Sequence, residues 1–233
     1  MKSSKIISFS ALLLATMLAC SSTFNLTATS VPISTSTPTP LPSPTFTPTP
    51  YPILFEDSEF TSSCTAESTK DVERFVENGQ FNMRVLTPSF VAWTECTKDK
   101  YTDFIMEVDA TQVGGPDNNA YGVIFRYVLD TKEFYAFLIS GDGFYVFTVD
   151  GSDLDEPEIL VKWTESPAIN KGAQTNHIQV MAVGGNMKYF INDQLLGEVQ
   201  DTRFTTGTLG FFAGTLKEGG VQVSFDNLKI LQP

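Results

Sequence analysis

AYGVIFRYVLDTKEFYAFLISGDGFYVFTVD, residues 120–150, is the stretch that decides the fold. It holds three apolar runs, at 120–129, 133–140 and 143–150, with short polar turns between them. A period of two is typical of β-strands, because successive side chains point to opposite faces of a sheet. The first run places one row in the core: Tyr121, Val123, Phe125, Tyr127 and Leu129. The opposite row is Gly122, Ile124, Arg126 and Val128.

The same alternation continues on both sides of this stretch. Residues 72–86 hold two short runs around Asn78-Gly79, which is a strong hairpin signal. Further strands are expected at 103–113, 158–165, 176–184, 186–193, 194–200, 207–214 and 221–231, and no segment has a helical period of useful length. About a dozen short strands predict an all-β, two-sheet antiparallel β-sandwich of the jelly-roll type. We assign it to residues 53–233.

The first 20 residues read as an export signal. A basic start, residues 1–5, precedes an apolar run that is too short to span a bilayer, so we expect a cleavable signal peptide at 1–19. The run closes with MLAC, which resembles the bacterial lipobox and implies that Cys20 is lipidated. An ordinary secretory signal with a chance cysteine is the alternative. We expect the protein at the cell membrane, facing the extracytoplasmic side, with the lipid as its only membrane anchor.

Residues 20–52 combine the lipidated cysteine with a stalk rich in Ser, Thr and Pro. Residues 30–52 contain 8 Pro, 6 Thr and 4 Ser among 23 residues. Proline fixes φ and lacks a backbone donor, so neither a helix nor a central strand forms there. We expect a disordered, polyproline-like tether that could reach ~70 Å at ~3.1 Å per residue.

Charge narrows the class of partner. The formal net charge is −12, and loss of Lys2 and Lys5 with the leader makes it −14. No Asp, Glu, Lys or Arg occurs from Cys20 to Leu54, so an acidic domain follows an uncharged tether. Phosphate binding needs clustered Lys and Arg. The sequence has no such basic stripe, so we expect no nucleic-acid partner. We expect a monomer.

Cysteine usage indicates an oxidising compartment. With Cys20 taken by lipid, Cys64 and Cys96 remain as an even pair. In an exported protein such a pair is expected to form a disulfide, and two buried thiols are the alternative. A metal site is disfavoured because the two cysteines lack nearby His partners.

The C-terminal half carries a recurring set of turns and glycines. These are Gly185-Asn186, Asn192-Asp193, Asp201, Gly207-Thr208-Leu209-Gly210 and Phe225-Asp226-Asn227. Together with GVIFRY at 122–127, they resemble the concanavalin A-like lectin/glucanase superfamily, in particular the laminin-G-like and 3-keto-disaccharide hydrolase-like domains of bacterial lipoproteins. The resemblance covers residues 119–231. It implies a concanavalin A-like sandwich and a carbohydrate or glycoconjugate partner, although this fold hosts lectins, glycosidases and adhesion modules.

The resemblance also implies where catalytic residues would sit. Retaining glycosidases need two carboxylates about 5–5.5 Å apart, and laminarinase-type enzymes carry them as Glu-x-Asp-x-x-Glu. The comparable run at 107–112, EVDATQ, ends in Gln112, which cannot protonate a leaving group. YAFL at 135–138 replaces the Tyr-Glu-x-Gln of the hydrolase-like group, and His177 has no evident nucleophile. We expect a binding domain, with a glycoside hydrolase as the alternative.

The candidate ligand residues are Trp93, Trp163, Arg126 and Asp142. A pyranose has an apolar face and a rim of hydroxyls, so its sites combine aromatic side chains with a few polar groups. Both tryptophans lie among polar residues near strand ends, and Arg126 is the one fixed charge on its expected face. We expect a shallow, partly apolar surface there, on which the small residues Gly122 and Ala136 leave space. The alternative is that loops or the N-terminal segment cover this face and make it a second core. A surface that holds another protein is the rival interpretation.

No cofactor is expected, and one ion is left open. The acidic turns at 114–119, 141–143 and 150–158 could bind Ca²⁺ through their oxygens. Solvated turns are the alternative.

Overall fold

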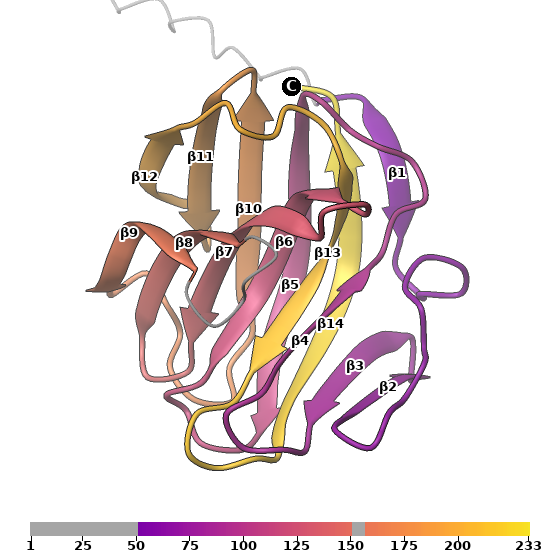
Figure 1. The fold of residues 1–233 in the computed structure, drawn as a ribbon, viewed down its shortest axis with the longest axis vertical. Helices are drawn as coiled ribbons and strands as arrows, with labels where there is room; N and C mark the ends of the chain where they lie inside the picture. The colour runs from indigo at the N-terminus through magenta and orange to yellow at the C-terminus, as the bar shows by residue number, and fades with distance from the viewer. Residues whose placement is uncertain (1–50, 151–156) are drawn as a thin grey trace, which may run out of the picture. The chain divides into compact units, whose positions relative to one another are not determined.

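The structure is a computed structural model that describes residues 51–150 and 157–233 (Figure 1). Every strand pair in it is antiparallel. The strands are β1 (Ile53–Asp57), β2 (Val72–Glu77), β3 (Gln80–Val85), β4 (Val91–Glu95), β5 (Phe104–Gly114), β6 (Ala120–Val128), β7 (Glu133–Ser140), β8 (Phe144–Asp150), β9 (Glu158–Glu165), β10 (Asn176–Val183), β11 (Asn186–Ile191), β12 (Gln194–Gln200), β13 (Thr208–Gly214) and β14 (Val221–Leu231).

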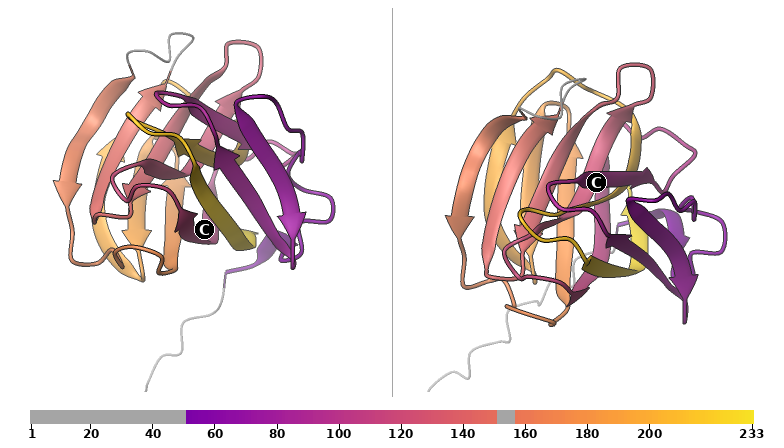
Figure 2. Two further views of the ribbon diagram at one scale, coloured as in Figure 1. Left: turned by 90° about the horizontal axis from the view of Figure 1, so that it is seen from below. Right: turned by 60° about the horizontal axis from the view of Figure 1, so that its bottom comes forward.

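The strands form two sheets, which the turned views of Figure 2 show as two layers. The eight-stranded sheet runs β12-β11-β10-β5-β14-β3-β2, and β1 also pairs with β14. The six-stranded sheet runs β4-β13-β6-β7-β8-β9, so β4 and β9 are its two edges. This all-β, concanavalin A-like sandwich confirms the predicted fold class.

Aromatic side chains join the two layers. Phe211 of β13 stacks on Phe225 of β14 with ring centroids 4.1 Å apart, and Phe125 of β6 meets Phe104 of β5 edge-on at 6.0 Å. All four rings are fully buried. Such pairs add to the energy of area burial, so they fix the face of each sheet that points inward.

The expected strands are all present, with ends shifted by at most two residues. The hairpin between β2 and β3 turns at Asn78 and Gly79, whose φ values are 53° and 77°. Two positive φ values are what a tight hairpin turn requires, which confirms the Asn-Gly signal. Two short edge segments, β1 and β4, were not expected. β4 packs so close to β13 that a Cβ at Gly210 would collide with the Thr94 carbonyl oxygen.

The disulfide between Cys64 and Cys96 is present, which confirms that prediction. It links the segment before β2 to the residue that follows β4. Closing a loop over a separation of 32 residues stabilises the fold by roughly 3–4 kcal/mol. The bond therefore anchors β4 at the edge of the six-stranded sheet.

Several predictions fall on residues outside the described ranges. These are the signal peptide, the lipidated Cys20, most of the stalk and the greater part of the turn at 150–158. Across residues 51–150 and 157–233, the structure contains no helix of the length and hydrophobicity that a bilayer crossing needs.

Candidate functional site

The outer face of the six-stranded sheet carries its own apolar cluster. Along β6 and β7 the inward residues join the main core, so their neighbours in sequence point outward. We call these outward residues the floor: Ile124, Tyr127, Phe134, Ala136, Leu138, Val146 and Phe212. Trp93 and Ala120 pack against them. The floor side chains are at most 6% exposed, so they pack as a small second core on this face.

Gly122 lies at the middle of the floor. It pairs with Phe212 on one side and with Leu138 on the other. A Cβ at this position would collide with the Phe137 carbonyl oxygen. The floor therefore has no side chain between Phe212 and Leu138, as the small residues in the sequence predicted.

A cavity of about 130 Å³ lies on the floor, and we call it the floor cavity. Its lining is Val91, Leu138, Val146, Thr148, Asp150, Pro157, Ile159, Trp163 and Phe212. Two of these residues, Thr148 and Asp150, bring polar side chains to an otherwise apolar wall. This combination matches what a pyranose ring requires.

Asp150 is a nearly buried acid at the end of β8, with 5% of its surface exposed. The Thr148 hydroxyl donates a hydrogen bond of 2.9 Å to Asp150 Oδ2. Burial raises the pKa of Asp150, and the Thr148 hydrogen bond only partly offsets that rise. The carboxyl group is thus well placed to exchange hydrogen bonds with a hydroxyl in the cavity.

Trp163 stands at the edge of the floor on β9, with 46% of its surface exposed. It lines the floor cavity and also a second cavity of about 280 Å³, which we call the turn cavity. The turn cavity is lined by Asn118, Ala120, Ser140, Asp142, Phe144, Trp163 and Leu216. The structure therefore brings two of the expected ligand residues, Trp163 and Asp142, to one cavity.

The Asp142 turn is held from several sides. The Ser140 hydroxyl donates to Asp142 Oδ1, and the Asp142 N–H donates to the Asp117 carbonyl at 3.1 Å. The turns at 114–119 and 141–143 are therefore neighbours. Fixed polar groups beside an exposed tryptophan reduce the ordering cost of binding.

Trp93 lies away from this pair, on β4 at the opposite edge of the sheet. Five strand spacings separate the two edges, about 24 Å along the sheet. The Trp93 ring packs on Phe134 at 5.7 Å and lines a separate cavity of about 230 Å³ with Arg74, Glu67 and Glu95. The structure thus does not bring the two tryptophans together.

Arg126 was expected on the outer face of the six-stranded sheet, and this prediction is wrong. A β-bulge interrupts β6 between Phe125 and Val128, and Arg126 adopts a φ of 52°. The bulge shifts the alternation, so Tyr127 joins the floor while Leu129 is exposed. Both residues had been assigned to the core.

The Arg126 side chain is fully buried and closes one end of the sandwich. Its guanidinium donates to the carbonyls of Thr102 at 2.8 Å, Gly184 at 2.7 Å and Phe204 at 3.0 Å. Burial lowers the pKa of Arg126, although the nearby Tyr135 and Asp103 oppose that change. Arg126 therefore ties three loops together and does not form part of the floor.

The loop after β12 is fixed by a second buried group. Tyr135 donates a 2.6 Å hydrogen bond to Asp201 Oδ1, and burial together with this bond raises the pKa of Tyr135 to about 12. Burial would raise the pKa of Asp201, but hydrogen bonds from Arg203 and Tyr135 outweigh it and lower that pKa to about 2. Arg203 also pairs with Glu158 of β9. The loop therefore links the two sheets.

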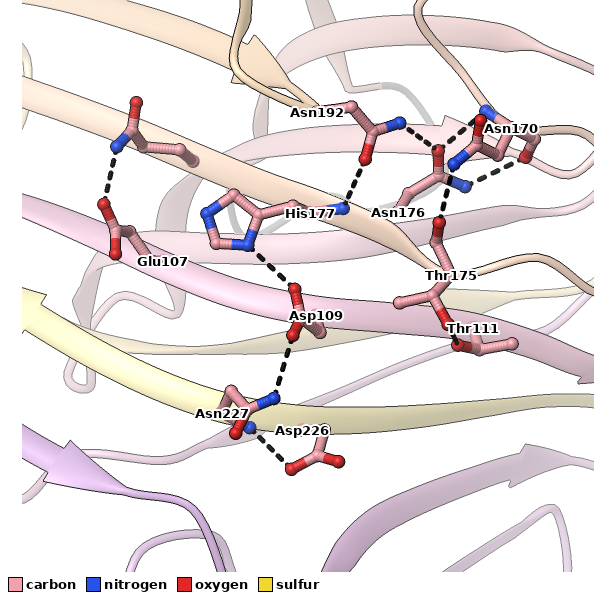
Figure 3. Close-up of polar contacts among 11 residues, drawn as sticks. Glu107, Asp109, Thr111, Asn170, Thr175, Asn176, His177, Asn192, Asp226 and Asn227 are labelled. Carbon is pink, nitrogen blue, oxygen red and sulfur yellow. Dashed lines mark hydrogen bonds and ion pairs between the residues drawn. The ribbon is translucent and has the colours of Figure 1, made fainter.

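The outer face of the eight-stranded sheet carries a different arrangement, which Figure 3 shows. We call it the polar strip: Glu107, Asp109, His177, Gln179, Asn192 and Asn227. His177 Nδ1 lies 2.8 Å from Asp109 Oδ1, and Asn227 Nδ2 donates to Asp109 Oδ2 at 2.9 Å. Gln179 donates to Glu107 at 2.7 Å, and the backbone N–H of His177 donates to Asn192 Oδ1 at 2.8 Å.

The partners in the polar strip use their hydrogen-bonding capacity on one another. Glu107 and Asp109 lie on the sheet opposite the floor, so they cannot act on a ligand bound there. Within the described residues, no Ser, Thr or Cys side chain is hydrogen-bonded to the His177 ring. This supports the interpretation of Glu107, Asp109 and His177 as structural surface residues.

The acidic turns at 114–119 and 141–143 carry the oxygens that were expected to bind calcium. Asp117 and Asp142 lie on adjacent turns, joined by a backbone hydrogen bond. In the parts of the chain that the structure describes, no group of three or more His, Cys, Asp or Glu side chains is arranged to hold a metal ion. A calcium site at these turns remains a prediction.

The sequence had placed Asp150 only in a candidate calcium-binding turn, and it gave no indication of Leu216. Val146, Thr148 and Asp150 alternate along β8, so the pattern already placed them on one face. Leu216 lies in the loop after β13, where no periodicity marks it.

Comparisons with known proteins agree with this architecture. Solved structures with a similar fold include the carbohydrate binding module CBM66 from Bacillus subtilis, at 17% identity and a TM-score of 0.58, covering 73% of this chain and 96% of that one. A protein of unknown function with a galectin-like fold, also from Bacillus subtilis, has 9% identity and a TM-score of 0.58, covering 78% and 96%. A GlcNAcα1-4Gal releasing endo-β-galactosidase from Clostridium perfringens has 12% identity and a TM-score of 0.55, covering 82% and 65%.

At these identities the likeness shows the fold alone. No curated protein matches the chain in sequence. Residues 56–231, however, match the 3-keto-alpha-glucoside-1,2-lyase-like domain family. That match spans nearly all of the sandwich and well over half of the chain, and it agrees with the resemblance drawn from the turns and glycines. The chain therefore belongs to the 3-keto-alpha-glucoside-1,2-lyase-like domain family.

Proposed function

We propose that this domain binds carbohydrate on the outer face of its six-stranded sheet and that it does so without cleaving it. The carrying observation is the floor cavity, where an exposed Trp163 and a nearly buried Asp150 meet on an apolar surface. The ring of Trp163 provides a flat apolar wall for a pyranose face. Thr148 and Asp150 provide hydrogen bonds for its hydroxyls.

The relatives support this choice of ligand. One similar structure is a carbohydrate binding module and another is a glycosidase, and the family is named for an activity on glucosides. The domain's acidic character favours a neutral glycan, because an anionic chain would be repelled.

The test is a calorimetric titration of the purified protein with neutral glucan, galactan and xylan oligosaccharides of defined length. We expect binding to at least one series, and weaker binding by Thr148→Val, which removes a hydroxyl from the cavity at nearly constant volume. Gln179→Ala, on the polar strip, is the control. Failure of every series to bind would contradict the proposal.

A catalytic role is the second candidate, and one observation favours it. Asp150 has a raised pKa in an apolar cavity, which is the setting of a general acid. Incubation with a 3-keto-α-glucoside distinguishes the two functions. For a binding domain, the amount of glycoside stays constant. Cleavage that disappears in Asp150→Asn would favour the enzyme.

We further propose that the domain is displayed at the cell surface as a lipoprotein. The support is the signal-like start, Cys20 in its MLAC context and the proline-rich stalk. We expect the wild-type protein to partition with membranes and Cys20→Ser to move to the soluble fraction. Equal partitioning of both proteins would contradict the lipid anchor.

A further inference from the structure

We propose that the ligand of this site is an oligosaccharide chain that crosses Trp163 and continues to the loop end of the six-stranded sheet, rather than a single terminal sugar. This inference rests on the proposed carbohydrate-binding function and specifies the length and path of its ligand.

The path is a series of three neighbouring cavities. Beyond the turn cavity lies a third one of about 340 Å³, which we call the end cavity. It is lined by Ser89, Pro116, Asn118, Asn119, Leu216, Lys217 and Glu218. Trp163 lines both the floor and turn cavities, and Asn118 and Leu216 line both the turn and end cavities. Each cavity thus shares a lining side chain with the next, and we call this series of three the groove.

Leu216 has 54% of its surface exposed, yet its backbone is firmly held. Its N–H donates to Asn119 Oδ1 at 2.7 Å, and its carbonyl accepts from the Ser89 N–H at 2.5 Å. Asn119 is buried and also donates to the Pro116 carbonyl at 2.7 Å. The loops that carry Ser89, Asn119 and Leu216 are thus hydrogen-bonded to one another through the Leu216 backbone. The Leu216 side chain remains exposed to solvent.

The loops on the Trp163 side are locked in the same way. Ser166, which follows β9, donates its N–H to the Gly143 carbonyl at 3.0 Å. Gly172 donates its N–H to the Gly141 carbonyl at 2.8 Å. The strand that carries Trp163 is therefore fixed to the Asp142 turn, and the groove is preorganised along its length.

The spacing of apolar and polar groups fits a chain of sugars. Trp163 and Leu216 are exposed apolar side chains at the two junctions between cavities. Polar groups are spread along the same path: Asp150 in the floor cavity, Asp142 in the turn cavity and Asn118 at the junction with the end cavity. A single ring in the turn cavity would lie beside both Trp163 and Leu216 but would leave the floor and end cavities empty, whereas a chain fills all three.

The experiment compares chain lengths by calorimetry on the purified protein. The probes are laminaribiose, laminarihexaose, cellobiose and cellohexaose. In at least one series, we expect the six-ring probe to bind more than tenfold tighter than the two-ring probe. A two-ring site that slides along six rings gains a statistical factor of only about five, which is roughly 1 kcal/mol.

Matched variants locate the extra affinity. In Leu216→Ala we expect the ratio of six-ring to two-ring affinity to fall about fivefold. Leu195→Ala is the control, because Leu195 is also an exposed leucine (56%) but lies on β12 of the other sheet. In this variant the ratio should equal that of the wild type.

Each outcome is decisive. Equal affinity for long and short probes, or a wild-type ratio in Leu216→Ala, would overturn the chain-length inference while leaving the carbohydrate-binding function intact. No binding to any of the four probes would overturn the inference, and the broader glycan panel then decides the proposed function separately.

Discussion

The two outer faces of this sandwich use their side chains in opposite ways. The polar strip on the eight-stranded sheet contains the carboxylates and the histidine that a search for chemistry finds first, yet these groups pair with one another (Figure 3). The floor of the six-stranded sheet is mostly apolar, but it is hollowed and has an exposed tryptophan at its edge. A sugar ring binds best where a hollow and an exposed aromatic ring are already formed, so the less polar face is the better candidate.

The largest expected effect concerns Trp163. Trp163→Ala should weaken binding of the best oligosaccharide at least tenfold, or about 1.4 kcal/mol, because the aromatic wall of two cavities is lost. His177→Ala, on the polar strip, should leave the affinity within twofold. Calorimetric titration of both variants measures this contrast. A larger loss for His177→Ala would reverse the assignment of the two faces.

A smaller effect is expected in the loop that connects the two sheets. Asp201 has a pKa lowered to about 2 in the folded protein against an ordinary 3.8, so it stabilises the fold above pH 4 and this contribution is lost as the pH falls toward 2. Asp201→Asn should therefore cost about 1 kcal/mol at pH 7, after allowance for solvent screening. The deficit should shrink below pH 4. Urea unfolding over a pH series tests this, and a pH-independent deficit would refute the charge argument.

The smallest effect is expected on the polar strip itself. Asp109→Asn weakens hydrogen bonds from His177 and Asn227 at a partly exposed site, so the free energy of unfolding should fall by about 0.5–1 kcal/mol. Glycan affinity should not change. Urea unfolding and titration of the same sample measure both quantities. An affinity loss without a stability loss would show that the strip contacts ligand.

Most of the fold was predictable, because a period of two is enforced wherever one face of a strand is buried. The failures have local causes. β1 and β4 are five residues each, too short for alternation to be distinguished from chance. At Arg126 the β-bulge shifts the period by one residue, and nothing in the neighbouring sequence marks it.

The candidate site was predictable only in part. Trp163 and Asp142 could be selected as exposed residues at strand ends, and the structure places them on one cavity. Asp150 is buried in the fold, and no local pattern in the sequence marks that burial. Leu216 owes its position to hydrogen bonds with Asn119 and Ser89, which are about a hundred residues away or more. Contacts at such separations leave no local pattern.

The pairing of β1 with β14 has a mechanical consequence. Ile53 is the first residue of β1 and lies opposite Leu231 of β14. A pulling force applied to the residues before β1 therefore acts first on the hydrogen bonds between β1 and β14. The hydrogen bonds between β1 and β14 would break one after another, starting at Ile53, which requires little force. The peeling would then reach Cys64, whose covalent bond to Cys96 transfers the load to the body of the sandwich. The disulfide thus limits how far the chain can be pulled out, and β1 can detach while the two sheets stay folded.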